Sequence, residues 1–455
     1  MLFALVVLAL FLAADVSAAT RTWTGAAGNN WTVASNWAGG SAPVAGDDLV
    51  FPASGANQVT TNNDFPNGTL FHSIVFSGGG YALNGNGFTI GAGGIRVTDG
   101  LHSIYPTITL GAPQTWVLSS GSAAVGIPGT INLNGMALTI GGGQPGPVSP
   151  VITNVTGDGS INVTGPTHSL TFVGNNNTTA PLTATNITIA IGGTYPAPII
   201  LGDSGGLQIF GGKTVGTVTA TGLNARFDPG STTGIANSGN VTLISHSQFQ
   251  EFITDAAVFN SLKLTGTISL GDADLTIATG TNAILQGTTF TIVDNDGLDP
   301  VSGTFHGLPE GAQVVAAATT PEIFSISYIG GTGNDIVLTA VGPAIGTSMT
   351  LTSSSNPVFS PASVTFTAKV SAASGTTAPT GTVDFLDLVA PDSLTHLATV
   401  ALDSSGTATF TTAALSPGAH TISAVYSNNN PPFAPVTQSV NEVVSAGPTR
   451  HRAAR

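Results

Sequence analysis

The sequence contains no cysteine and few charged residues. Without cysteine, no disulfide bond stabilises the chain, so stability must come from packing and hydrogen bonds. Charged residues make up 7% of the 455 residues, against about 25% in ordinary soluble domains. Lys and Arg number only 9, and Arg450, Arg452 and Arg455 lie in the C-terminal tail. Because binding phosphate groups needs clustered cations, the composition argues against nucleic acid and anionic lipid surfaces as partners.

Long apolar runs are also scarce. The run from Leu2 to Ala14 is too short to span a bilayer but suits the core of a signal peptide, and the small residues Val16–Ala19 follow it. We predict a signal peptide at residues 1–19, cleaved after Ala18 or Ala19, and therefore an exported chain. No later run reaches the roughly 18 apolar residues of a membrane helix, so we predict no membrane insertion. The lack of a base before Leu2 and the abrupt C-terminus predict an incomplete chain.

Residues 20–341 contain many short runs in which apolar and small polar residues alternate, separated by Gly, Asn or Asp. A strand this short buries one face, so stacking many strands into one continuous core is the economical fold. The pattern predicts an all-β chain whose first domain is a right-handed parallel β-helix-like solenoid, with a β-sandwich or jelly roll as the alternative. The best helical candidate, or an irregular crossing, is Ser247–Leu264. Runs of the recurring type are Phe88–Gly91, Leu138–Gly141, Leu170–Phe172, Leu207–Ile209 and Leu275–Ile277.

Three tryptophans, Trp23, Trp31 and Trp37, begin the repeat region. Large aromatic rings can cover the open end of a solenoid while their N–H groups bond turn carbonyls, so the favoured interpretation is an N-terminal cap. The alternative is a glycan-binding platform, because aromatic faces pack on the apolar faces of sugars. That alternative predicts exposed rings.

The motifs around these tryptophans carry a resemblance. WTG (23–25), NNW (29–31), NW (36–37) and GDDLVF (46–51) resemble the start of bacterial secreted proteins with autotransporter-associated β-strand repeats. The segments Gly303–Gly311, Phe324–Tyr328 and Gly330–Leu338 are similar to the end of such repeat regions. The resemblance implies a secreted, extracellular or cell-surface bacterial protein.

Calcium is the one cofactor that the sequence suggests. Asp294, Asp296 and Asp299 form the densest acidic cluster and resemble the start of a calcium loop, although the distal Glu of an EF-hand is missing. An Asx-rich turn is the alternative interpretation. Gly330–Leu338 fits a calcium-binding nonapeptide, but such turns bind only in stacked copies and here there is one. We therefore favour a closing hairpin for that segment.

Catalysis by a β-helix lyase or hydrolase needs paired carboxylates, or acids near a cation. Asp272 and Asp274 would share one face of a strand and form a like-charged pair. The eight His show no metal-ligand spacing. We predict no catalytic residue and no enzymatic activity, with a polysaccharide lyase or glycoside hydrolase as the alternative. The five bases between residues 20 and 341, none of them in a motif with acids, are Arg21, Arg96, Lys213, Arg226 and Lys263.

A linker at 342–346 precedes a segment, 347–444, of the size of one sandwich domain. The motifs Pro379–Phe385, Leu415–His420 and Ile422–Tyr426 closely resemble the bacterial Ig-like repeat family. The resemblance implies a spacer or adhesion module, with Tyr426 in its core or corner and a hairpin turn at 403–406. A disordered basic tail follows at 445–455. The expected strands are Ser363–Val370, Gly381–Leu386, Ala398–Leu402, Gly406–Phe410 and His420–Tyr426.

Together these patterns predict an exported structural or adhesion protein, such as an adhesin or stalk. The expected partner is an extracellular glycan or a surface protein, and calcium is the only cofactor expected.

Overall fold

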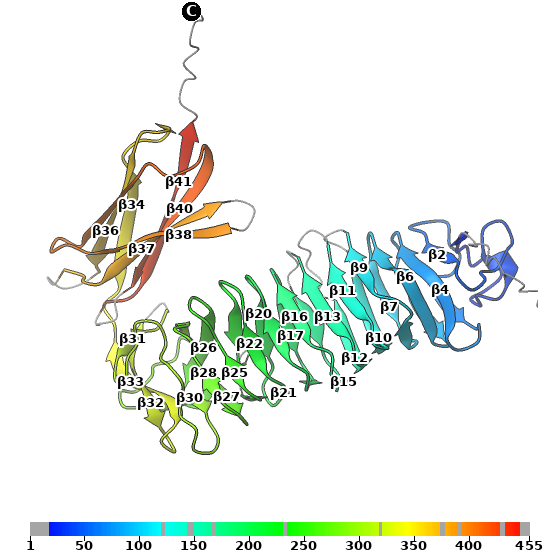
Figure 1. The fold of residues 1–455 in the computed structure, drawn as a ribbon, viewed down its shortest axis with the longest axis horizontal. Helices are drawn as coiled ribbons and strands as arrows, with labels where there is room; N and C mark the ends of the chain where they lie inside the picture. Colours follow the sequence, from blue (N-terminus) through cyan, green and yellow to red (C-terminus); the bar gives the residue numbers. More distant parts are fainter. Residues whose placement is uncertain are drawn as a thin grey trace, which may run out of the picture. The chain divides into compact units, whose positions relative to one another are not determined.

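A computed structural model of the chain describes residues 18–119, 123–142, 150–165, 169–230, 234–317, 321–373, 378–389, 393–427 and 433–445. It confirms the all-β prediction: a β-solenoid of about 10 turns and a C-terminal Ig-like domain, with 57% of the described residues in strands. Figure 1 shows both parts. The described residues contain one short 3-10 helix, η1 (Ala34–Asn36), and no α-helix. The predicted signal peptide up to residue 17, and the tail from residue 446, lie outside the described residues. The chain divides into two compact units, Met1–Leu182 and Thr183–Arg455.

In the first unit, parallel strands stack coil upon coil. β2 pairs in register with β4, and β4 with β6, so Leu49, Ile74 and Ile95 form one buried column. Alternate residues of a strand point to opposite faces, which places the apolar residues inside and the small polar residues outside. The strands are β1 (Thr20–Thr22), β2 (Asp48–Phe51), β3 (Thr60–Asn63), β4 (Thr69–Phe76), β5 (Ala82–Gly85), β6 (Phe88–Val97), β7 (Leu101–Ile104), β8 (Ile108–Leu110), β9 (Gln114–Leu118), β10 (Ala124–Asn132), β11 (Ala137–Gly141), β12 (Val151–Gly157), β13 (Ser160–Thr164), β14 (Leu170–Phe172) and β15 (Asn177–Thr178).

In the second unit, the coils repeat in three columns of parallel strands. One column runs through β17, β20, β23, β26 and β29, and a second through β19, β22, β25 and β28. The third runs through β18, β21, β24 and β27. The strands are β16 (Leu182–Thr185), β17 (Thr188–Ile191), β18 (Thr194–Tyr195), β19 (Ile199–Leu201), β20 (Gly206–Ile209), β21 (Thr214–Val215), β22 (Val218–Ala220), β23 (Arg226–Asp228), β24 (Gly234–Ser238), β25 (Val241–Thr242), β26 (Gln248–Asp255), β27 (Val258–Leu264), β28 (Ile268–Ser269), β29 (Asp274–Thr279) and β30 (Thr289–Asp294).

The helical interpretation of Ser247–Leu264 is wrong. The segment forms β26 and β27, which pair antiparallel with each other, while β26 also pairs with β29. Along β26 burial alternates, with Phe249, Glu251 and Ile253 inside. A period of two residues fits a strand and not a helix.

Antiparallel strands end the solenoid. They are β31 (Gln313–Val315), β32 (Glu322–Gly330) and β33 (Asp335–Pro343), and β33 pairs with both β30 and β32. The turn between β32 and β33 confirms the predicted closing hairpin at Gly330–Leu338.

The C-terminal domain is a sandwich of a three-stranded and a five-stranded sheet. The strands are β34 (Thr347–Ser353), β35 (Val358–Phe359), β36 (Val364–Ala372), β37 (Thr382–Val389), β38 (Ser393–Ala401), β39 (Thr407–Thr412), β40 (Gly418–Ser427) and β41 (Val436–Ser445). Tyr426 is fully buried and its hydroxyl donates to the carbonyl oxygen of Thr380, as predicted for a core or corner residue. The turn at 403–406 connects β38 to β39, which lie in different sheets, so it is not the hairpin turn that we predicted.

Candidate functional site

The three tryptophans are buried: Trp23 and Trp31 are 0% exposed and Trp37 is 2% exposed. The Nε1 of Trp23 donates to the carbonyl oxygen of Gln58 and that of Trp37 to the carbonyl oxygen of Trp31, both at 2.7 Å. Stacking on a sugar needs an exposed ring face. The structure therefore contradicts the predicted glycan platform of Trp23, Trp31 and Trp37.

The same rings form an aromatic cluster with two phenylalanines of the first coils. The centroids of Trp23 and Trp37 lie 5.1 Å apart at an interplanar angle of 78°, and Trp31 lies 5.7 Å from both Phe51 and Phe71. Edge-to-face packing of this kind stabilises beyond the burial of area alone. This packing supports the interpretation of the tryptophans as a cap.

The predicted calcium trio does not converge. The Oδ2 of Asp294 lies 3.2 Å from the Nζ of Lys263, and Asp296 is exposed. The carbonyl oxygen of Asp299 accepts the Nδ2 of Asn295 at 2.8 Å. Within the described ranges, no group of three or more His, Cys, Asp or Glu side chains could hold a metal ion. Because calcium needs six to eight convergent oxygens, Asp294, Asp296 and Asp299 do not form the expected ligand set.

The segment Gly330–Leu338 packs against that acidic turn. The Nδ2 of Asn334 donates to the carbonyl oxygen of Asp299 at 3.0 Å, and the backbone N–H of Asn295 donates to the Oδ1 of Asp335, also at 3.0 Å. One side-chain amide and one carboxylate thus connect the two segments directly. Both motifs singled out for calcium act here as turn-stabilising elements.

One corner of the second unit carries a column of turn residues with positive φ. Each lies two residues before a strand of the same column, and the first residues of these strands are successive register partners, from Thr188 in β17 to Asp274 in β29. Stacking in register therefore aligns the turn residues as well. We call them the corner ladder: Asn186 (φ 55°), Ser204 (φ 50°), Asn224 (φ 56°), His246 (φ 63°) and Asp272 (φ 65°).

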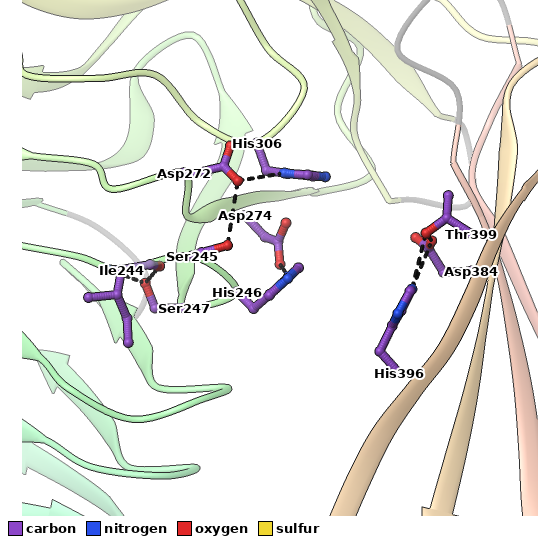
Figure 2. A network of polar contacts seen from close by, with 10 residues as sticks. All are labelled: Ile244, Ser245, His246, Ser247, Asp272, Asp274, His306, Asp384, His396 and Thr399. Atoms are coloured by element: carbon purple, nitrogen blue, oxygen red, sulfur yellow. Dashed lines mark hydrogen bonds and ion pairs between the residues drawn. The ribbon is translucent and has the colours of Figure 1, made fainter.

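The last two members of the corner ladder are titratable, and two neighbours complete a group that we call the corner cluster: His246, Asp272, Asp274 and His306 (Figure 2). The Nδ1 of His306 lies 3.0 Å from the Oδ2 of Asp272. The Nδ1 of His246 lies 3.9 Å from the Oδ2 of Asp274, and the two imidazole centroids are 5.9 Å apart. The hydroxyl of Ser245 also donates to the Oδ2 of Asp272, at 3.4 Å.

Backbone register brings His306 to this cluster. Its N–H donates to the carbonyl oxygen of Ala273 at 2.8 Å, just as the N–H of Asp274 donates to that of Ser247 at 2.7 Å one coil earlier. His306 therefore stacks above Asp274. The cluster is a product of coil stacking, because 34 residues separate the bonded pair Asp272 and His306.

The surroundings of the corner cluster shift the pKa values of two of its members. Burial raises the pKa of Asp274, against the opposing effect of His306 and His246. The hydrogen bond to Asp272 raises the pKa of His306, and the charge of Asp274 adds to this. An acid with a raised pKa beside a carboxylate bonded to imidazole is a combination that general acid–base catalysis uses.

The sequence placed only part of this cluster. Asp272 and Asp274 do lie together, but Asp272 belongs to the turn and β29 begins at Asp274, so the prediction that they share one face of a strand is wrong. His246 and His306 were missed because no local spacing joins them to the acids. The available signal was that His246 precedes a strand by two residues, as Asn224 does in the coil before.

The sandwich carries a separate polar group on its surface, also drawn in Figure 2. The Nε2 of His396 lies 3.6 Å from the Oδ1 of Asp384 and 3.0 Å from the Oγ1 of Thr399, whose hydroxyl donates to Asp384. These side chains come from the paired strands β37 and β38. They form a cross-strand contact of the kind that stabilises a sheet modestly.

Glu251 is a deeply buried acid of the solenoid. It is 2% exposed, points inward between Phe249 and Ile253, and neither carboxyl oxygen has a hydrogen-bond partner. Burial raises its pKa well above the ordinary value and the nearby Asp228 adds to this, while the adjacent N–H of Phe252 opposes it. Glu251 is therefore held in its neutral form over a wider pH range than a free glutamate.

The sandwich instead buries an acid with a partner. The Nδ1 of His420 lies 2.7 Å from the Oδ2 of Asp387, and its Nε2 lies 2.7 Å from the carbonyl oxygen of Ser416. A carbonyl oxygen can only accept, so the Nε2 carries a proton. Both side chains of the pair are less than 10% exposed.

The fold defines the class of protein as a β-solenoid with an Ig-like sandwich. Comparison with known families gives the sandwich a more particular assignment: residues 351–445 match the family described as "Bacterial Ig-like domain (group 3)". No curated protein matches the chain. The predicted Ig-like domain is confirmed, while the resemblance of the coils to autotransporter-associated repeats stays a prediction. The described residues include no helix long and apolar enough to cross a membrane.

Proposed function

We propose that this chain is an exported structural protein of the bacterial cell surface or its surroundings, and that it serves as an adhesin or stalk. The observation that supports this best is the architecture, a repetitive solenoid joined to a bacterial Ig-like domain. Each coil contacts mainly its neighbours, so such a fold builds an elongated surface from one repeated unit. The partner would be an extracellular glycan or a surface protein.

The location can be tested in the native organism with an antibody against the Ig-like segment. We expect the protein in the medium, or on intact cells in a form that added protease removes. A protein found only inside protease-treated intact cells contradicts the proposal. The matched control is a cytoplasmic protein, which must survive the same treatment.

Adhesion needs its own measurement. Cells that lack the gene should lose attachment to a glycan array or to a host or neighbouring cell surface, and the purified chain should compete with wild-type cells for the same surface. Unchanged attachment in the deletion strain would contradict the adhesive role and leave only the structural role.

The corner cluster favours a second candidate function, cleavage of a polysaccharide. Asp274 would act as the general acid because burial raises its pKa, and the pair of Asp272 and His306 would act as the base. The full chain would be incubated with a panel of polysaccharides and assayed for reducing ends and unsaturated sugars. We expect Asp274→Asn to abolish any product and the exposed control Asp296→Asn to leave it unchanged. No product, or product that survives Asp274→Asn, rejects this candidate.

A further inference from the structure

A buried carboxylate faces the start of the described chain. Asp47, directly before β2, is 2% exposed. Its Oδ1 accepts the backbone N–H of Ala19 at 3.2 Å, and its Oδ2 binds the Nε of Arg21 at 2.8 Å and the N–H of Val44 at 3.0 Å. One buried acid thus gathers three donors around the first strand.

Ala19 is held on both sides of its backbone. Its carbonyl oxygen accepts the N–H of Asp48 at 2.9 Å, which is one of the bonds that pair Thr20 of β1 with Asp48 of β2. Loss of Ala19 would therefore leave the N–H of Asp48 and one oxygen of Asp47 without these partners. Loss of everything up to Ala18 would remove neither contact.

The sequence predicts cleavage after Ala18 or after Ala19. Cleavage after Ala18 keeps the contact between Ala19 and Asp47, and cleavage after Ala19 removes it. We propose that the chain is processed between Ala18 and Ala19, and that the new α-ammonium group of Ala19 binds the carboxylate of Asp47 and fixes the first strand on the solenoid. This inference rests on the proposed export. Water hydrolyses the peptide bond, Ala18 leaves with the new carboxylate, and the amine of Ala19 takes up a proton.

The electrostatics around Asp47 suit a cation at this position. Burial disfavours the ionised form, but Arg21 and the N–H groups of Val44 and Ala19 outweigh it and lower the pKa of Asp47. A charged donor strengthens a hydrogen bond to a carboxylate relative to a neutral amide. The carboxylate of the neighbouring Asp48 has partners of its own, because its Oδ1 lies 2.7 Å from the Nδ1 of His72 and accepts the hydroxyl of Ser73.

The processing site is tested by intact mass and N-terminal sequencing of the exported full chain. We expect a chain that begins at Ala19. An exported chain that begins at Thr20, or at any other residue, overturns this inference and leaves the proposed function standing. A chain that is not exported contradicts the proposed function instead, and the second test then decides the inference.

The second test uses purified chains that begin at Ala19, with either a free amine or a Gly-Ser extension. We expect the extension to lower the melting temperature of the first transition by roughly 2–4 °C, and Asp47→Asn to remove this difference. The matched control Asp48→Asn should retain it. Equal melting temperatures in the wild-type pair, or a difference that persists in Asp47→Asn, overturn the inference.

The pH dependence gives a readout that needs no substitution. An α-amine titrates near pH 7.7–8.0 in an unfolded chain, and pairing with Asp47, beside Arg21, would raise its pKa in the folded state. The advantage of the free amine over the extended chain is therefore complete below about pH 7.7 and is lost as the pH rises through the folded value. A difference that does not change up to pH 11 contradicts the ammonium contact.

Discussion

Two buried acids, one in the sandwich and one in the solenoid, differ in whether the carboxyl group has a hydrogen-bond partner. Asp387 in the sandwich lies 2.7 Å from His420, whereas neither oxygen of Glu251 in the solenoid has a hydrogen-bond partner. Replacing Asp387 should therefore destabilise the fold, whereas replacing Glu251 should stabilise it at high pH. A paired buried acid leaves a partner behind when it is removed, while an unpaired buried acid costs stability whenever it ionises.

The largest effect is expected in the sandwich. Asp387→Ala leaves the Nδ1 of His420 without its acceptor, and breaking a buried pair typically costs about 3–5 kcal/mol. Urea unfolding of the full chain, followed by a probe in the sandwich, measures the loss. The matched control is Asp384→Ala on the same strand, where the partly exposed partner His396 can bond water, and we expect less than about 1 kcal/mol. Equal losses for the two variants would remove the distinction between paired buried and surface acids.

Removal of the carboxyl group of Glu251 should instead stabilise the solenoid at high pH. The pKa of Glu251 is raised in the folded chain, so the carboxyl group stabilises the fold below its unfolded pKa of about 4.3, and this contribution is lost as the pH rises through the folded value. Each unit by which the pKa is raised costs about 1.4 kcal/mol at high pH. We expect Glu251→Gln to raise the melting temperature of the solenoid at pH 8 and to flatten its dependence on pH. A lower melting temperature of Glu251→Gln at pH 8 would mean that the carboxylate has a partner. The exposed control is Asp296→Asn.

The smallest effect is expected at the exposed corner cluster. His306→Asn removes the imidazole bonded to Asp272, and surface pairs of this kind contribute about 0–1 kcal/mol. Because that bond raises the pKa of His306, its contribution is present below about pH 6.5 and is lost as the pH rises through the folded value. Thermal unfolding at pH 5.5 and pH 8 should separate wild type from the variant only at the lower pH. His246→Asn should change less, because its ring lies 3.9 Å from Asp274.

The alternation of apolar and polar residues predicted the class of the fold but not every one of its elements. Alternation and turn residues were enough for an all-β chain with a solenoid and a sandwich, because a strand that buries one face needs every second residue apolar. At Ser247–Leu264 the helical prediction is wrong, because Phe249 and Ile253 stand four residues apart, a spacing that a helix and a strand both allow. A short apolar segment fits both periods until its partner strands are known.

The candidate sites were harder to predict than the fold. Trp23, Trp31 and Trp37 can cap a solenoid or bind a sugar, and burial against Phe51 and Phe71 excludes the exposed platform. The acids at 294–299 can bind calcium or form turns, and among the described residues they do not gather into a group of three that could hold a metal ion. Composition names the groups that are available, but only geometry brings them together.

The sequence by itself determined the β class, the absence of disulfides, the Ig-like domain and the small number of charges. These follow from residue types and local periodicity. Only the tertiary structure decided that the imidazole of His306 pairs with Asp272, that the N–H of Ala19 donates to Asp47 and that Glu251 points inward. The physical reason is that a solenoid aligns residues one coil apart, and the lengths of its turns, which no local pattern fixes, set which residues become neighbours.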